Sequence, residues 1–106
     1  MKQGDHITDY EEIAGMSLHD IARSEKVVIF ASGLTDTRMI IRFLTDRGIP
    51  FRVVEMGMGS SRSRVDFRRL CDMTNWHLLP QIFVDGRFIG GVDELFEKFK
   101  ASGSLN

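Results

Sequence analysis

The segment from Gln81 to Gly90, QIFVDGRFIG, constrains the fold of this chain more than any other stretch. Two short apolar runs flank an Asp-Gly pair, which is the strongest short-range signal for a β-hairpin. Apolar residues at helical spacing then follow from Val92. The C-terminal part is therefore predicted to form two antiparallel strands followed by a helix.

The segment before it predicts a strand, a helix and a second strand. KVVIFA is a continuous apolar and β-branched run, typical of a central strand that is covered on both faces. Asp36 is a candidate cap for a helix that ends at Gly48, and Pro50 prevents its continuation into the strand FRVVEM. Connections this short favour a right-handed βαβ unit with parallel strands.

The remaining segments complete one domain. Ser17 is a good cap for a short helix, LHDIARSE, and the loop GMGSSRSR leads into a helix from about Arg64 to Met73. Residues 1–16 are expected to form an N-terminal arm or a short turn of helix, and residues 17–106 the domain. The predicted fold is α/β and thioredoxin-like, a four-stranded mixed sheet flanked by helices, with one extra N-terminal helix.

Composition excludes several classes of function. A chain of 106 residues, 42% of them hydrophobic, matches one domain with a single core. Its 14 basic and 15 acidic side chains leave a net charge of −1, which predicts neither a nucleic acid nor a membrane partner. The polar N-terminal segment is unlike a signal peptide, so we expect a cytoplasmic location. The single cysteine, Cys71, excludes an intramolecular dithiol centre.

Residues 75–95, NWHLLPQIFVDGRFIGGVDEL, resemble the C-terminal half of a glutaredoxin. The shared pattern is an apolar residue before proline, a Gln and a strand, an Asp-Gly turn, and a Gly-Gly-x-Asp that opens the last helix. The Asn-Trp pair is more similar to the single-cysteine members than to the two-cysteine members. The resemblance also covers residues 17–55, and it implies the thioredoxin-like fold and a groove for glutathione.

The resemblance also implies which residues form that groove. The Leu79–Pro80 bond would be cis, and the extended backbone of Leu79 would pair with a bound peptide as an additional strand. Gly91 allows close backbone approach, and the amides of Val92 and Asp93 at a helix start can hold a carboxylate. The alternative for the same segment is a hairpin followed by a capped helix, without a ligand.

The chain departs from the glutaredoxin pattern where the active-site cysteine should be. The family carries Cys-x-x-Cys or Cys-x-x-Ser at the start of the helix after the first strand. Alignment of RGIPF places the two outer positions at Leu34 and Thr37, and alignment of the first strand places them at Thr35 and Arg38. Neither register contains a thiol, so thiol chemistry and iron–sulfur ligation are not expected here. Thr35, Asp36 and Thr37 are also what a helix cap looks like.

Cys71 is expected to have a structural role, because it lies on an apolar helical stripe and in a last turn, where the helix dipole opposes a thiolate. The alternative is a reactive thiol at the rim of the groove.

Trp76 is expected in the core or on a groove wall. Four arginines are expected to form a solvated helix face or, alternatively, to supply positive charge to the groove: Arg62, Arg64, Arg68 and Arg69. No metal site is predicted, because the three histidines do not have the spacing of metal ligands on a helix or a hairpin: His6, His19 and His77.

The predicted function is that of a redox-inactive adaptor that keeps a glutathione or peptide groove and acts through an unidentified protein partner. The alternative is a glutathione-dependent thiol-disulfide oxidoreductase that uses Cys71 or a cysteine of a partner. A third possibility is a regulatory subunit whose N-terminal segment docks on a larger protein.

Overall fold

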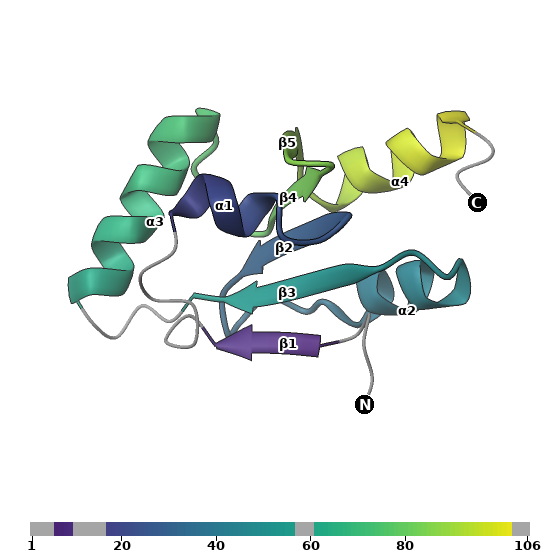
Figure 1. The fold of residues 1–106 in the computed structure, drawn as a ribbon, viewed down its shortest axis with the longest axis horizontal. Helices are drawn as coiled ribbons and strands as arrows, with labels where there is room; N and C mark the ends of the chain where they lie inside the picture. The colour runs from purple at the N-terminus through teal and green to yellow at the C-terminus, as the bar shows by residue number, and fades with distance from the viewer. Residues whose placement is uncertain (1–5, 10–16, 57–60, 103–106) are drawn as a thin grey trace.

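The computed structural model describes residues 6–9, 17–56 and 61–102. Figure 1 shows one sheet with helices beside it. The elements, in chain order, are β1 (His6–Asp9), α1 (Leu18–Ala22), β2 (Val27–Ala31), α2 (Arg38–Asp46), β3 (Phe51–Glu55), α3 (Ser61–Thr74), β4 (Gln81–Val84), β5 (Arg87–Gly90) and α4 (Val92–Ser102).

The sheet has the strand order β1-β3-β2-β4-β5. Strands β2 and β3 are parallel, β4 is antiparallel to β2, and β5 is antiparallel to β4. The predicted four-stranded mixed sheet is therefore confirmed as β3-β2-β4-β5. The Asp85-Gly86 turn between β4 and β5 has φ angles of 55° and 82°, which are those of the hairpin turn that the sequence predicts.

Strand β1 adds a fifth strand at the edge of this sheet. It runs parallel to β3, with His6 opposite Arg52 and Asp9 opposite Glu55. We expected an arm or a short turn of helix in residues 1–16, and the helical alternative was wrong for these four residues. Residues 1–5 and 10–16 lie outside the described residues. The domain boundary after residue 16 stays a prediction.

Strand β2 is the centre of the core, because all five of its residues are buried. Its side chains alternate between the two faces of the sheet. Val27, Ile29 and Ala31 pack in one apolar cluster with α2 and α4, and Val28 and Phe30 pack in a second cluster with residues of α1 and α3. The continuous apolar run is thus explained by helices on both faces (Figure 1).

The helix boundaries follow local capping chemistry. The Oγ of Ser17 accepts a hydrogen bond of 3.0 Å from the amide of Asp20, which confirms the predicted cap of α1. Helix α2 ends before Gly48, whose φ of 68° is in the left-handed region. Helix α3 begins at Ser61, earlier than the predicted Arg64, and ends at Thr74.

The register of β2 and β4 places two loops at the same end of the sheet. Phe30, near the C-terminal end of β2, pairs with Gln81, the first residue of β4. The loop that leads into α2 therefore leaves the sheet beside the loop that contains Leu79 and Pro80. Helix α4 starts directly after β5, which pairs with β4. This end of the sheet carries the predicted site residues.

Candidate functional site

The loop between α3 and β4 is held at its base by a buried glutamine. The side chain of Gln81 is 0% exposed, and its Nε2 donates a 2.8 Å hydrogen bond to the carbonyl oxygen of Trp76. Its Oε1 lies 2.8 Å from the hydroxyl of Thr74. A buried amide with both ends paired fixes the backbone on either side of it. The Leu79–Pro80 bond within this loop is cis, the isomer that the resemblance implies.

The start of α4 packs closely against this loop. A Cβ atom added to Gly91 would lie 3.6 Å from the carbonyl oxygen of Pro80 and 3.7 Å from the indole of Trp76. The amide of Gly91 donates a 2.9 Å hydrogen bond to the carboxylate of Glu94. The structure therefore brings Pro80 next to Gly91, ahead of the first helical residues Val92 and Asp93. The Gly91 amide is already paired within the chain.

The start of α2 contains no thiol in either possible register. Leu34 is 97% exposed, so its side chain does not pack in the core. The Oγ1 of Thr35 accepts a 3.2 Å hydrogen bond from the amide of Ser32 and lies 3.1 Å from its hydroxyl. Thr37 is the N-cap residue, and Arg38 is the first residue of α2. The prediction that these residues form a helix start is thus confirmed, with Thr37 rather than Asp36 in the cap position.

The carboxylate of Asp36 lies at the start of α2, where the helix dipole favours an anion. The Oδ1 of Asp36 accepts hydrogen bonds from the amide of Arg38 at 3.1 Å and from its Nε at 3.0 Å, and Oδ2 accepts one from Nη2 at 2.9 Å. The guanidinium, followed by the backbone amide, lowers the pKa of Asp36 to about 2. The positive end of the α2 dipole therefore faces a fixed negative charge of the chain itself.

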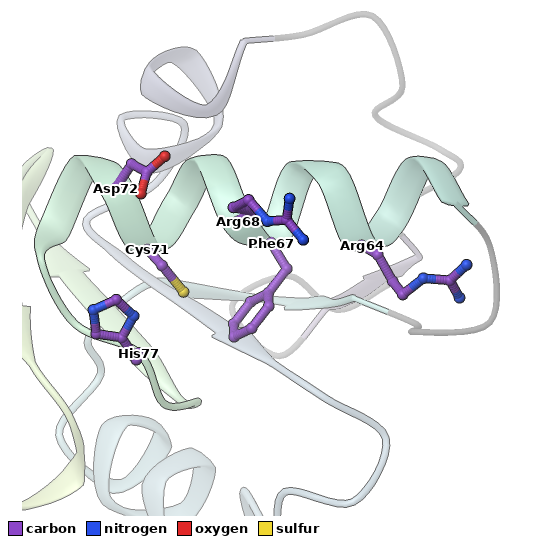
Figure 2. Close-up of a pocket in the computed structure, with 6 residues that line it drawn as sticks. All are labelled: Arg64, Phe67, Arg68, Cys71, Asp72 and His77. Carbon is purple, nitrogen blue, oxygen red and sulfur yellow. The ribbon is translucent and has the colours of Figure 1, made fainter.

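Cys71 lies at the wall of a pocket between α3 and the segment after it. The pocket, called the Cys71 pocket below, has a volume of about 430 Å³. Figure 2 shows Phe67 and Cys71 pointing from α3 to the same side, with His77 opposite Cys71 and the Asp72 carboxylate directed elsewhere. The residues that line the pocket are Arg64, Phe67, Arg68, Cys71, Asp72 and His77.

The thiol of Cys71 is poorly suited to nucleophilic attack. Its side chain is 5% exposed, and Sγ lies 4.0 Å from the Nε2 of Gln81. Burial, followed by the negative charge of Asp72, raises the pKa of the Cys71 thiol, against a weaker opposing effect of the Gln81 hydrogen bond. The burial of Cys71 supports the structural role that the sequence predicts, and that role stays a prediction.

The arginines of α3 separate into different surroundings. Arg64 and Arg68 line the Cys71 pocket, whereas Arg69 points to Asp66, with 3.9 Å between Nη1 and Oδ1. The side chain of Arg62 lies outside the described residues. Sequence reasoning assigned no site role to Phe67 or to His77. The spacing of 64, 67, 68 and 71 on one helical face is the signal that points to a shared surface.

The described residues offer no metal site and no membrane span. No group of three or more His, Cys, Asp or Glu side chains in residues 17–56 and 64–100 is arranged to hold a metal ion. Among the described helices, none is long and apolar enough to cross a membrane.

Known proteins resemble this chain over most of its length. The glutaredoxin family model matches residues 27–89. Monothiol glutaredoxin-S14, a chloroplastic protein of Arabidopsis thaliana, is 30% identical over 90 residues, which are 79% of this chain and 50% of that protein. The chain therefore spans about half the length of the first curated relatives that it matches. The chloroplastic name does not support the cytoplasmic location expected from the sequence.

Solved structures agree with the fold. The holo form of glutaredoxin C1 from Populus tremula x tremuloides is 27% identical, with a TM-score of 0.67 over 78% of this chain and 82% of that chain. A buckwheat glutaredoxin–glutathione complex is 20% identical, with a TM-score of 0.69 over 79% and 76% of the two chains. Because the family model covers more than half of the sequence and the architecture agrees with it, this chain belongs to the glutaredoxin family.

Proposed function

We propose that this chain is a glutaredoxin-family module without redox chemistry of its own, which binds glutathione or an extended peptide and acts through a protein partner. One observation carries the proposal. The cis-Pro loop and the start of α4 lie so close together that a Cβ added to Gly91 would be 3.6 Å from the Pro80 carbonyl oxygen, while the start of α2 has no thiol. These two features support a module that keeps the binding half of the family site and lacks its reactive half.

The ligand would use backbone groups of the loop and of α4. The residue before proline is extended, so the N–H and C=O of Leu79 can pair with a peptide backbone. The first amides of α4, at Val92 and Asp93, have no intrahelical partner and favour a carboxylate. The γ-glutamyl end of glutathione supplies such a carboxylate, and the buckwheat relative was solved as a glutathione complex.

Titration with reduced glutathione tests the groove. We expect the amide NMR signals of Leu79, Val92 and Asp93 to shift in a saturable manner at millimolar glutathione. Asp93→Asn removes the carboxylate that can pair with the amino group of the γ-glutamyl residue, so it should weaken the shifts. Asp46→Asn, at the far end of α2, should not. Unchanged signals at all three positions would exclude glutathione as a ligand.

The protein partner has a test of its own. Large apolar side chains are exposed around this end of the sheet: Leu34 is 97% exposed and Leu78 is 71% exposed. Exposed apolar groups beside a groove favour contact with another protein. A partner that co-purifies with the wild type should be lost with the Leu34→Ser/Leu78→Ser variant and kept with Val65→Ser, on the exposed face of α3. A partner retained by both variants would show that this surface does not bind it.

A second candidate function is glutathione-dependent thiol-disulfide exchange through Cys71. The position of Cys71 on a pocket favours it, as does the monothiol name of the Arabidopsis relative. Burial and the raised pKa of the thiol oppose it. A glutathione-coupled disulfide reduction assay on wild type and Cys71→Ser decides the matter, and equal background rates would reject this function.

A further inference from the structure

The loop from His77 to Pro80 crosses the end of the sheet between α3 and α4. His77 lines the Cys71 pocket together with Arg68 of α3. Pro80 is on the other side, where its carbonyl oxygen would be 3.6 Å from a Cβ added to Gly91, directly before α4. Leu78, between His77 and Pro80, is 71% exposed. This surface therefore has α3 on one flank, an apolar side chain in the middle and the start of α4 on the other flank.

The two flanks carry opposite charge. Arg64 and Arg68 line the pocket beside α3, whereas the carboxylate of Asp72 is directed elsewhere (Figure 2). Asp93 and Glu97 are exposed one turn apart on α4, and the two lysines of this helix come later. Within the part of the chain that the structure describes, Arg68, Asp93 and Glu97 form no ion pair. Charges of both signs are thus available to a partner at this end of the sheet.

A basic flank, an apolar centre and an acidic flank in a row are complementary to the same row turned by 180°. In a dimer with twofold symmetry, both copies use the same surface and each contact occurs twice. A twofold axis at Leu78 brings the α3 flank of each copy against the α4 flank of the other. Opposite charges then face each other across the interface at both flanks. Charge complementarity therefore favours a second copy of this chain as the occupant of the surface.

We infer that the chain forms a homodimer through this surface, with Leu78 of both copies at its centre. Arg68 of one copy lies opposite Asp93 and Glu97 of the other. Leu34, which is 97% exposed on the neighbouring loop, adds apolar area to the interface. This inference rests on the proposed function, since it names the protein partner of the surface that carries Leu34 and Leu78. Because exposed ion pairs are screened by salt, the dimer should weaken as the salt concentration rises.

Charge reversal tests the dimer, and sedimentation velocity over a range of protein concentrations measures its dissociation constant. We expect Arg68→Glu and Glu97→Arg each to raise this constant at least about tenfold, because both symmetric contacts become repulsive. An equimolar mixture of the two variants should restore association close to that of the wild type, since each contact again joins opposite charges. Glu97 is changed rather than Asp93 so that the proposed glutathione groove is not altered.

Two further variants complete the experiment. Leu78→Ser removes the apolar centre and should also weaken the dimer. Arg87→Glu is the matched control for charge reversal and should leave the dissociation constant unchanged. Arg87 is exposed beside the Asp85-Gly86 turn, at the opposite end of the sheet, and forms no ion pair with any described residue. Circular dichroism confirms that each variant is folded.

The outcomes separate this inference from the proposed function. A wild type that stays monomeric at every concentration overturns the inference and leaves the groove, with another protein as partner, standing. A dimer that neither charge reversal weakens also overturns it, because the interface then lies elsewhere. Weakened variants that do not associate with each other exclude the twofold arrangement and overturn it as well. Weakening by each variant with recovery in the mixture supports the inference, even if glutathione shifts no amide signal.

Discussion

The carboxylate of Asp36 binds both the backbone amide and the guanidinium of Arg38, at 3.1 Å for the amide and at 3.0 and 2.9 Å for the guanidinium nitrogens. This places a permanent negative charge at the start of α2. The positive end of a helix dipole stabilises an anion, and glutaredoxins use it for a thiolate. In this chain the carboxylate of Asp36, rather than a thiolate, lies in that favourable field.

Removing the guanidinium should raise the pKa of Asp36. In Arg38→Gln, we expect this pKa to move from about 2 toward the ordinary value of 3.8, because the leading cause of the shift is lost. The lowered pKa stabilises the folded state above the unfolded-state value, and that contribution is lost as pH falls toward about 2. Carboxyl-carbon NMR between pH 1.5 and 6 measures the pKa of Asp36. An unchanged pKa would show that the pair does not form in solution, and Arg42→Gln is the control.

A thiol introduced at the start of α2 should respond to the neighbouring carboxylate. In a Cys71→Ser background, we expect Thr35→Cys/Asp36→Asn to have a lower thiol pKa than Thr35→Cys alone. The reason is that a nearby negative charge disfavours the thiolate, whose ordinary pKa is about 8.5. The pH dependence of iodoacetamide alkylation, followed by mass spectrometry, measures both values. Asp46→Asn, at the other end of α2, should have no such effect, and equal values for the first two variants would contradict the prediction.

Cys71 should react slowly in the folded protein. Because its thiol is buried and its pKa is raised, we expect alkylation at pH 7.5 at least about tenfold slower than in the urea-unfolded chain. Comparable rates in the two states would mean that the thiol is accessible and would favour the oxidoreductase alternative.

The Cys71 thiol should also make the free energy of unfolding depend on pH in the alkaline range. A pKa that is higher in the folded state stabilises the fold below the unfolded-state pKa, and this contribution disappears as pH rises through the folded value. We expect the free energy of unfolding to fall more steeply above about pH 8.5 in the wild type than in Cys71→Ala. Urea denaturation at several pH values measures both slopes, and parallel slopes would refute the effect.

Adjacent glycines before α4 should respond differently to alanine. Gly90 has a φ of 122° and an added Cβ would lie 2.6 Å from Cγ of Glu94, so we expect Gly90→Ala to cost about 1–3 kcal/mol in unfolding free energy. A Cβ on Gly91 meets its neighbours only at 3.6 Å or more, so Gly91→Ala should stay within about 0.5 kcal/mol. Chemical denaturation measures both, and equal losses would contradict the assignment.

Gly91→Ala should nevertheless weaken glutathione binding. The methyl group would lie next to the Pro80 carbonyl oxygen and directly before the Val92 amide, to which the ligand carboxylate is proposed to bind. The glutathione titration described above measures the change, and an unaltered affinity would place the ligand elsewhere.

Several elements could be predicted from the sequence, because they depend on interactions between residues that are close together in the chain. The Asp85-Gly86 hairpin, the Ser17 cap and the end of α2 at Gly48 each depend on residues within a few positions of one another. The continuous apolar run of β2 indicated burial on both faces for the same reason. Strand β1 was not readable, because its pairing with β3 joins residues more than forty positions apart and HITD has no clear alternation.

The sequence by itself determined the order of the elements from α1 to α4, the family resemblance and the absence of a thiol before α2, since each is a property of residue identity and local spacing. The tertiary structure decided what surrounds the site. It placed Asp36 on Arg38, tied Trp76 to the buried Gln81, and set His77 across a pocket from Cys71. These contacts depend on how helices pack on the sheet, and packing is set by the whole core rather than by any short segment.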